Sequence, residues 1–376
     1  MGIHSENKSQ TYNSVSSSKK EDNEREIIKI PDLFELFMSR TPTVNPFYEH
    51  VKDQALEWAT DICHYNTQEA ERMRRGDFAY FAAVSVPDAD TNKLRTVNDW
   101  LNWVFVFDDQ LDDGHFSRNG KTVEAFEYID SMIAVLDGET RPESDLSTQA
   151  LRDVLKSIWE RVNGDPDCAD DAKLRWKQNM TSYLAALRAS MTYEPSDNLE
   201  KTVGGYIDYR FHSIGVLPLF SFIEYAYNLT IPDEVFKNRS MQEMQRVGVE
   251  IQMLANDCVS YRREKANDCP HNIIYLLRYH GFSEQEAYNH VQILLRNRYK
   301  EWYLAQAQLP TWGERVDREV QWYIKGMQDV ALANANWSFR TERYFGGDRE
   351  HVRETREVPS KVEWLPGILV EGKAEV

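Results

Sequence analysis

The chain has 376 residues, of which 41% are hydrophobic and 28% are charged, and its formal net charge at pH 7 is −17. This length and hydrophobic content suffice to bury a large core in one helical domain or in two modest domains. The excess of acidic residues argues against nucleic-acid binding and against docking on an anionic membrane, because both partners require a basic surface. No apolar run reaches the length of a membrane-spanning helix.

The amino-terminal segment and the cysteines indicate the cellular setting. Residues 1–26 are rich in Ser, Lys, Asn and Glu and can bury little apolar area, so we expect a disordered tail there. The cysteines form no Cys-x-x-Cys pair and follow no signal peptide, which predicts free thiols in a reducing compartment. They are Cys63, Cys168, Cys258 and Cys269. The absence of a targeting segment predicts a cytoplasmic protein.

Helical periodicity runs through nearly every long segment of the chain. In chain order, the long predicted helices cover residues 68–85, 91–113, 121–137, 146–163, 170–193, 240–265, 283–308 and 312–342. Two shorter pieces surround Gly215 and Pro218, and alternating strand patterns are almost absent. The sequence therefore predicts an all-α, single-domain helical bundle over residues 27–346, with its site between facing helices in the bundle core. A C-terminal tail is expected at 347–376.

An acidic run ends the predicted helix at 91–113. It reads Asp108-Asp109-Gln110-Leu111-Asp112-Asp113 and follows an apolar, aromatic segment. Side chains three or four residues apart share a helix face, so Asp108 and Asp112 lie together with Asp109 close by. A solvated acidic helix end is the simpler interpretation of such a run. The apolar residues before it and the repulsion between like charges at this spacing favour a bound cation instead.

A second oxygen-rich stripe lies in the predicted helix at 240–265. Asn256, Ser260 and Glu264 fall at i, i+4 and i+8 and line one face. A polar face in contact with solvent is the alternative interpretation of this stripe. Ligands that offer only oxygen suit a hard divalent cation, above all Mg²⁺, which often shares its coordination shell with substrate phosphates. We interpret the two motifs as opposite walls of a cleft that holds Mg²⁺ and a diphosphate.

This pair of motifs resembles that of the class I terpene synthases, in which an aspartate-rich helix faces a helix carrying Asn-x-x-x-Ser-x-x-x-Glu. Two further segments are similar to the family. Arg210 lies where the family has a diphosphate-sensing arginine, although Phe211 stands where many fungal relatives have a second arginine. Trp337-Ser338, followed by Arg343 and Tyr344, looks like the family's terminal Arg-Tyr pair with its preceding Trp-Ser.

The resemblance covers roughly residues 30 to 346, with four motifs in the family's order. In detail the chain looks most like fungal sesquiterpene cyclases of the presilphiperfolanol-synthase type. The segments 104–110 and 213–216 carry this closer likeness. The resemblance implies the class I terpenoid synthase fold and a cyclase that ionises farnesyl diphosphate and releases diphosphate. The product would be a polycyclic sesquiterpene hydrocarbon or alcohol.

The resemblance also implies roles for individual residues. Three Mg²⁺ ions would be held by Asp108, Asp109, Asp112, Asn256, Ser260 and Glu264. The residues expected to act directly on the leaving diphosphate are Arg210, Arg343 and Tyr344. Further substrate contacts are expected from Arg263, from Lys265, from the backbone at the Gly215 kink, and from the aromatic residues Tyr80, Phe81, Phe105 and Trp337. For any single aromatic residue, packing in the core is an equal alternative.

Two other classes of protein remain open at this point. A chain-elongating prenyl diphosphate synthase also binds allylic diphosphates on an α-helical bundle, but it normally carries two aspartate-rich motifs where this chain has only one. A non-catalytic helical scaffold would leave the four ordered motifs unexplained. The expected partners are farnesyl diphosphate and diphosphate, with no nucleic acid and no membrane. The chain is expected to act as a monomer or a homodimer.

Overall fold

A computed structural model describes residues 27–112, 122–139, 145–192, 196–266 and 271–359. The predicted tail at 1–26 and the thiol of Cys269 lie outside these ranges. Cys63, Cys168 and Cys258 are free thiols, as predicted. None of the helices in the described ranges is both long enough and apolar enough to cross a bilayer.

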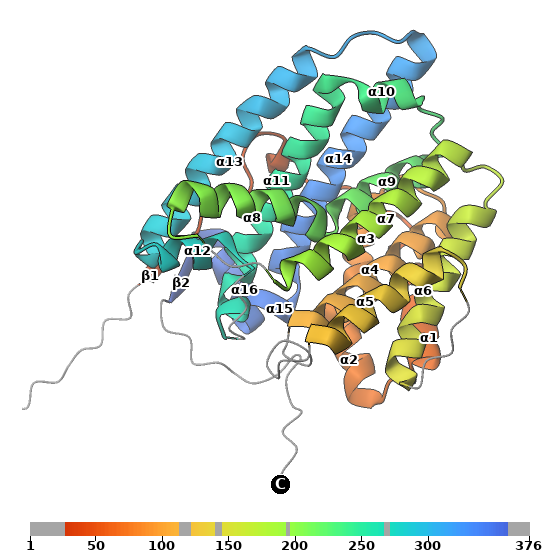
Figure 1. The fold of residues 1–376 in the computed structure, drawn as a ribbon, viewed down its shortest axis with the longest axis horizontal. Coiled ribbons are helices and arrows are strands. Elements are labelled where there is room, and N and C mark those ends of the chain that lie inside the picture. Colours follow the sequence, from red (N-terminus) through yellow and green to blue (C-terminus); the bar gives the residue numbers. More distant parts are fainter. Residues whose placement is uncertain (1–26, 113–121, 140–144, 193–195, 267–270, 360–376) are drawn as a thin grey trace, which may run out of the picture.

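The described residues form a bundle of α-helices, so the all-α prediction is confirmed (Figure 1). In chain order the helices are α1 (Tyr48–Cys63), α2 (Thr67–Gly76), α3 (Phe78–Ser85), α4 (Thr91–Asp112), α5 (Thr122–Leu136), α6 (Leu146–Gly164), α7 (Asp170–Ser190), α8 (Leu199–Ser213), α9 (Val216–Tyr227), α10 (Asp233–Lys237), α11 (Arg239–Ala266), α12 (Ile273–Tyr279), α13 (Glu284–Ala307), α14 (Glu314–Arg340), α15 (Glu342–Phe345) and α16 (Arg349–Thr355). Short 3₁₀ turns lie at Leu36–Ser39 and Gly346–Asp348.

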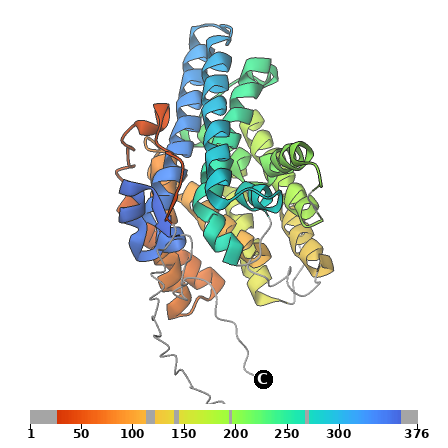
Figure 2. The same ribbon diagram turned by 90° about the vertical axis from the view of Figure 1, so that its left-hand side faces the viewer.

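The long helices α11, α13 and α14 run side by side and form one half of the bundle (Figure 2). Helix α14 also packs on α3 and α9, while α7 packs on α5, α8 and α9. Helices α9 and α14 approach closely at Gly326, where an added Cβ would lie 2.5 Å from Ile223 Cγ2. The core between these layers is rich in large aromatic side chains, including the fully buried Trp100, Trp176 and Trp302.

The single helix predicted at 68–85 is wrong, because the chain breaks there into α2 and α3. Asp77 adopts the left-handed conformation, with φ 47° and ψ 45°. Its carboxylate accepts hydrogen bonds from Tyr48 Oη at 2.8 Å and from Arg340 Nε at 2.9 Å. Residues distant in the sequence therefore stabilise the kink at Asp77. The apolar periodicity does not reveal this kink, because it continues from α2 into α3.

A second break separates α8 from α9 and was predicted around Gly215. Gly215 has φ +77°, a conformation that glycine adopts without steric cost. Pro218 is the third residue of α9. A backbone N–H there would have no partner inside the helix, so the proline does not interrupt α9.

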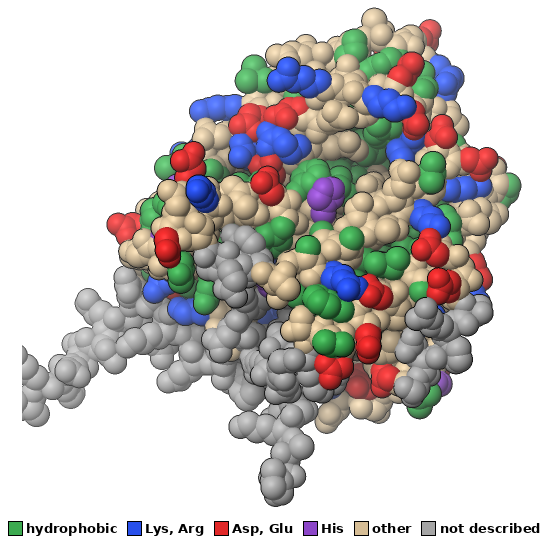
Figure 3. Space-filling model, in the orientation of Figure 1, with side chains coloured by type: hydrophobic (Ala, Val, Ile, Leu, Met, Phe, Trp, Pro, Cys, Tyr) green, Lys and Arg blue, Asp and Glu red, His purple; other side chains and the backbone are tan. Residues whose placement is uncertain are grey.

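The predicted tail at 347–376 has a described part that extends to Pro359. Helix α16 packs on α14 and α15, and β2 (Glu357–Pro359) pairs antiparallel with β1 (Ile27–Lys29). Val352 and Val358 are both buried. This short ribbon ties the two ends of the described chain to the helical body (Figure 1). On the face shown in Figure 3, acidic and basic side chains are interspersed.

Candidate active site

A pocket opens between α4, α11 and α14 and reaches the break between α8 and α9. It encloses about 760 Å³ of empty space, counting the open solvent at its mouth. Its lining residues are Phe81, Trp100, Leu101, Val104, Phe105, Asp108, Asp109, Arg210, Ile214, Gly215, Val216, Leu219, Gln252, Asn256, Ser260, Arg263, Glu264, Asn334, Arg343 and Tyr344. The pocket thus combines acidic, basic and amide groups with an apolar, largely aromatic surface.

Helix α4 supplies both kinds of surface. Trp100, Leu101 and Val104 line the apolar part, and Asp108 and Asp109 follow four to nine residues later along the same helix. An α-helix rises 1.5 Å per residue, so the two aspartates are attached roughly 6–14 Å further along the axis than these apolar residues. The sequence prediction that an apolar helix leads directly to the acidic motif is therefore confirmed.

The two acidic residues have different partners. Asp108 Oδ1 accepts a hydrogen bond from Tyr183 Oη at 2.8 Å. Asp109 lies between two guanidinium groups, with Arg263 Nη2 at 2.8 Å from Oδ1 and Arg343 Nη1 at 2.9 Å from Oδ2. Burial alone would raise the pKa of Asp109, but the charges of the two arginines outweigh this and lower it. Asp109 is therefore ionised and links helix α4 to α11 and α15.

Helix α4 ends at Asp112, and the side chain of this third predicted acidic ligand lies outside the described residues.

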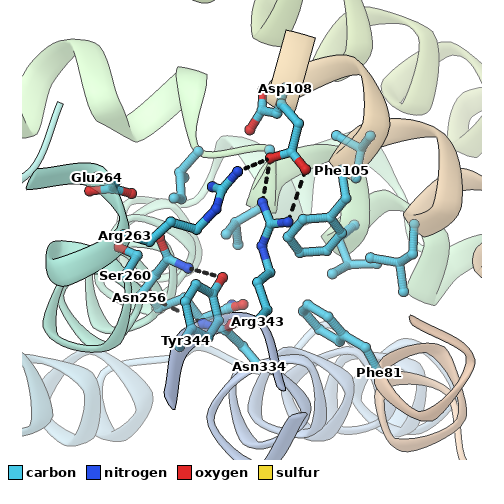
Figure 4. A pocket seen from close by; sticks show the side chains of 18 of the residues that line it. Phe81, Phe105, Asp108, Asn256, Ser260, Arg263, Glu264, Asn334, Arg343 and Tyr344 are labelled. Atoms are coloured by element: carbon cyan, nitrogen blue, oxygen red, sulfur yellow. Dashed lines mark hydrogen bonds and ion pairs between the residues drawn. The ribbon is translucent and has the colours of Figure 1, made fainter. Parts of the chain in front are cut away.

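The opposite wall is formed by α11. Asn256, Ser260 and Glu264 all line the pocket, as the i, i+4, i+8 spacing predicted (Figure 4). Ser260 and Glu264 are buried, and Glu264 Oε2 accepts a hydrogen bond from Asn272 Nδ2 at 2.8 Å. Asn256 Nδ2 lies 3.5 Å from Tyr344 Oη, so this wall also contacts α15.

Arg210 enters the pocket from the last turn of α8. Burial would lower the pKa of its guanidinium, but Tyr206, Asp257 and Glu264 raise it well above its ordinary value, so the group is cationic. Its Nε is buried and has no hydrogen-bond partner among the described residues. Phe211, its neighbour, packs edge-on against His212 and does not line the pocket. The arginine that faces the pocket from this helix is therefore Arg210.

Arg343 and Tyr344 reach the pocket from the short helix α15. The Arg343 guanidinium lies 5.2 Å from the centre of the Phe105 ring. Thr341 caps this helix by accepting a hydrogen bond from the Arg343 backbone N–H. Figure 4 shows the side chains of Arg263 and Arg343 pointing toward the end of α4 that carries Asp108. Three arginines from three different helices thus line the same pocket.

Three predicted substrate contacts lie away from the pocket surface. Trp337 is fully buried behind the lining, with ring centres 4.8 Å from Phe105 and 5.4 Å from Phe81. Tyr80 packs against Tyr48 and under the Arg340 guanidinium. The Lys265 side chain is half-exposed, with Nζ 3.4 Å from Glu284 Oε2. By contrast, Phe81, Phe105 and Gly215 line the pocket as expected.

Two amide side chains in the pocket were not predicted. Gln252 lies one helical turn before Asn256, on the same face of α11, so the spacing argument could have found it. Asn334 comes from α14, and its Nδ2 lies 3.4 Å from the Gln252 backbone oxygen. No sequence pattern singles out Asn334, because it stands within an apolar, alanine-rich segment.

Among the described residues, no three side chains of His, Cys, Asp or Glu gather into a ready-made metal cluster. The described oxygen-bearing side chains that were predicted as ligands are instead divided between two walls, with Asp108 and Asp109 on α4 and Asn256, Ser260 and Glu264 on α11. This set of donors suits a hard divalent cation that completes its shell with water and phosphate oxygens. The residues present therefore fit the predicted metal if an anionic ligand bridges the walls.

Comparisons with known proteins agree with this geometry. Residues 99–301 match the family model described as terpene synthase family 2, C-terminal metal binding. The chain is 36% identical over 334 residues to silphinene synthase peniA of Penicillium patulum, covering 88% of this chain and 89% of that protein. It is also 36% identical over 333 residues to (+)-eremophilene synthase of Gibberella fujikuroi, with 88% and 91% covered.

A solved structure shares the fold. Germacradien-4-ol synthase from Streptomyces citricolor matches with a TM-score of 0.67 at 19% identity, over 81% of this chain and 97% of that chain.

Proposed function

Since the chain belongs to the terpene synthase family, we propose that it is a Mg²⁺-dependent sesquiterpene cyclase that ionises farnesyl diphosphate and releases diphosphate. The observation that carries this proposal is the pocket itself. Oxygen-bearing side chains on two walls and three arginines line it, together with an apolar, aromatic surface. One end suits a diphosphate with its cations, and the other suits a hydrocarbon chain.

The arginines would bind the leaving diphosphate. Arg263 and Arg343 already lie at the acidic end of α4, and Arg210 lines the same pocket from α8. A planar guanidinium can bind two phosphate oxygens at once, so these residues can stabilise the negative charge that develops as the carbon–oxygen bond breaks. Tyr344, whose hydroxyl lies near Asn256, can donate a further hydrogen bond to the diphosphate.

The metal site would be shared between the walls. Asp108, Asp109, Asn256, Ser260 and Glu264 would hold Mg²⁺, together with Asp112 at the end of α4. Bound Mg²⁺ would supply Lewis-acid stabilisation of the diphosphate oxygens. The match to a family model for metal binding supports a divalent cation in general. The choice of Mg²⁺ rests on the oxygen-only character of the ligands.

The apolar surface would guide the carbocation after ionisation. Phe81, Trp100 and Phe105 line the cavity, and each aromatic face can stabilise a nearby cation by about 0.5–2 kcal/mol. A surface of this kind also excludes water from reactive intermediates. The relatives named silphinene synthase and (+)-eremophilene synthase support a cyclic product of sesquiterpene size.

The test is incubation of purified protein with farnesyl diphosphate and Mg²⁺, followed by gas chromatography with mass spectrometry and an assay for released diphosphate. We expect a cyclic C15 product that is lost when EDTA removes the cation. Geranyl and geranylgeranyl diphosphate serve as matched substrates of other chain lengths. A product that appears only when isopentenyl diphosphate is added would instead identify a chain-elongating prenyl diphosphate synthase. Absence of any product from farnesyl diphosphate would contradict the proposal.

A further inference from the structure

Asn272 is a fully buried residue that no motif includes, and it lies directly behind the ligand wall of α11. It is the N-cap residue of α12, where its Oδ1 accepts a hydrogen bond from the Ile274 backbone N–H at 2.8 Å. The other half of the same amide faces α11. Its Nδ2 donates to Glu264 Oε2 at 2.8 Å and to the Asp257 backbone oxygen at 2.9 Å, with Ser260 Oγ at 3.5 Å.

The residues around Asn272 hold it in place. The Ile273 backbone N–H donates to Asp257 Oδ2 at 2.9 Å, and Tyr206 Oη of α8 donates to the same oxygen at 2.5 Å. Tyr209 Oη lies 3.0 Å from His271 Nδ1. The segment that carries Asn272 is thus tied to both α8 and α11, so its amide is a fixed reference point for the side chains it contacts.

These contacts matter because Glu264 and Ser260 are flexible ligand types. A glutamate has three rotatable side-chain bonds, and a metal site requires its carboxylate in one orientation. A hydrogen bond from a fixed amide N–H selects that orientation, and partners of this kind typically change metal affinity 10–100-fold. At the position of Asn272 Nδ2, only a hydrogen-bond donor can orient the Glu264 carboxylate, because an anionic or acceptor atom there would repel it.

We propose that Asn272 is a positioning residue for cation binding, whose side-chain N–H groups orient Glu264 and Ser260 toward the pocket. This inference rests on the proposed function, in which Glu264 and Ser260 bind Mg²⁺. Asn272 itself does not line the pocket. It acts through the two ligands it contacts, and it also couples them to the start of α12.

The informative variant is Asn272→Ser. Serine is as good an N-cap as asparagine, so the cap on Ile274 is retained while the donor toward Glu264 is removed. A matched control exists at Asn45, another buried asparagine that is distant from the site. Its Oδ1 accepts from the Phe47 backbone N–H, and its Nδ2 donates to the Val86 and Ala89 backbone oxygens. Asn45→Ser therefore removes the same kind of bonds without touching a ligand.

Cation binding is measured directly by titrating Mg²⁺ into metal-free protein with inorganic diphosphate in an isothermal calorimeter, beside thermal unfolding without metal. We expect Asn272→Ser to weaken Mg²⁺ binding at least tenfold, and excess Mg²⁺ to restore much of the turnover. Asn45→Ser should lower the melting temperature and leave Mg²⁺ binding unchanged. Equal Mg²⁺ affinity in Asn272→Ser and wild type would overturn the positioning role.

The wild-type titration separates this inference from the proposed function. If wild-type protein with diphosphate binds no Mg²⁺, or if Glu264→Gln binds it as wild type does, then the ligand assignment itself fails and the positioning role fails with it. If wild type binds Mg²⁺, Glu264→Gln does not, and Asn272→Ser behaves as wild type, only the role of Asn272 is refuted.

Discussion

Phe105 and Phe107 are two residues apart on α4, and the structure places them on opposite sides of the cavity wall. Phe105 lines the pocket, whereas Phe107 is fully buried and stacks on Trp103 and Tyr128. The same substitution at both positions therefore separates control of the product from stability of the core. We predict that Phe105→Leu changes the product distribution and that Phe107→Leu changes only the stability.

The magnitudes follow from the contacts of each ring. The aromatic face of Phe105 can stabilise a nearby carbocation by about 1 kcal/mol. Losing this stabilisation changes the ratio of two competing reaction channels about fivefold. The shift should favour acyclic or monocyclic products, because cations would be released earlier. At Phe107, the lost stacking and the altered shape should cost about 1–2 kcal/mol of unfolding free energy, which is a few degrees in melting temperature. Phe105 also stacks on Phe78 at 4.5 Å, so its variant should lose some stability as well.

The assay combines product analysis by gas chromatography with thermal unfolding for both variants and wild type. Product ratios are compared at equal conversion, so that a loss of yield does not imitate a change in ratio. An unchanged ratio in Phe105→Leu would refute the cavity role of this ring. A shift of equal size in Phe107→Leu would show that general loosening of α4, rather than a cation–aromatic contact, controls the products.

Three other predictions follow from the site. Asp108→Asn and Glu264→Gln should each remove most turnover with unchanged far-ultraviolet circular dichroism, because each removes an anionic oxygen from one wall; near-wild-type turnover in both would contradict the metal assignment. Arg210→Lys should raise KM for the diphosphate substrate and Arg210→Ala should nearly abolish kcat/KM, since lysine keeps the charge without the bidentate fork; full activity in Arg210→Ala would transfer the role to Arg263 or Arg343. Burial and the charge of Arg210 lower the pKa of His271 to about 4. As the pH falls, the His271 imidazole is therefore protonated in the unfolded chain at a higher pH than in the folded protein. The free energy of unfolding should therefore drop between about pH 6.5 and pH 4, by on the order of 3 kcal/mol, and denaturant titrations should show a flatter profile for His271→Gln; an identical profile would exclude His271 as the source.

Much of the pocket could be predicted from the sequence because the candidate ligand residues repeat along single helices. The face of α11 that carries Asn256, Ser260 and Glu264 follows from the helical period alone, and the apolar approach to Asp108 follows from local composition. Arg210 and Arg343 could be placed only by resemblance to a family, since nothing in their local sequence distinguishes them from surface arginines.

The remaining features depend on contacts between distant segments. The break at Asp77 is stabilised by Tyr48 and Arg340, and Trp337 Nε1 donates to the Gly76 backbone oxygen at 2.7 Å. This bond holds Trp337 behind the pocket lining, although the resemblance implied a substrate contact for it. Asn272 was not predicted for the same reason, because its contacts with α11 form only when α12 folds back against that helix.

The balance of charge among the described lining residues supports the proposed role of a cation in binding a diphosphate. Among the described lining residues, the three carboxylates of Asp108, Asp109 and Glu264 formally cancel the three guanidinium groups of Arg210, Arg263 and Arg343. A diphosphate added to this neutral set would bring several uncompensated negative charges into a partly buried site, where charge is costly. Under the proposed function, divalent cations that enter with the diphosphate would remove that cost and would compete with the two arginines for Asp109. Ionisation should therefore depend on the cation even where all three arginines are intact.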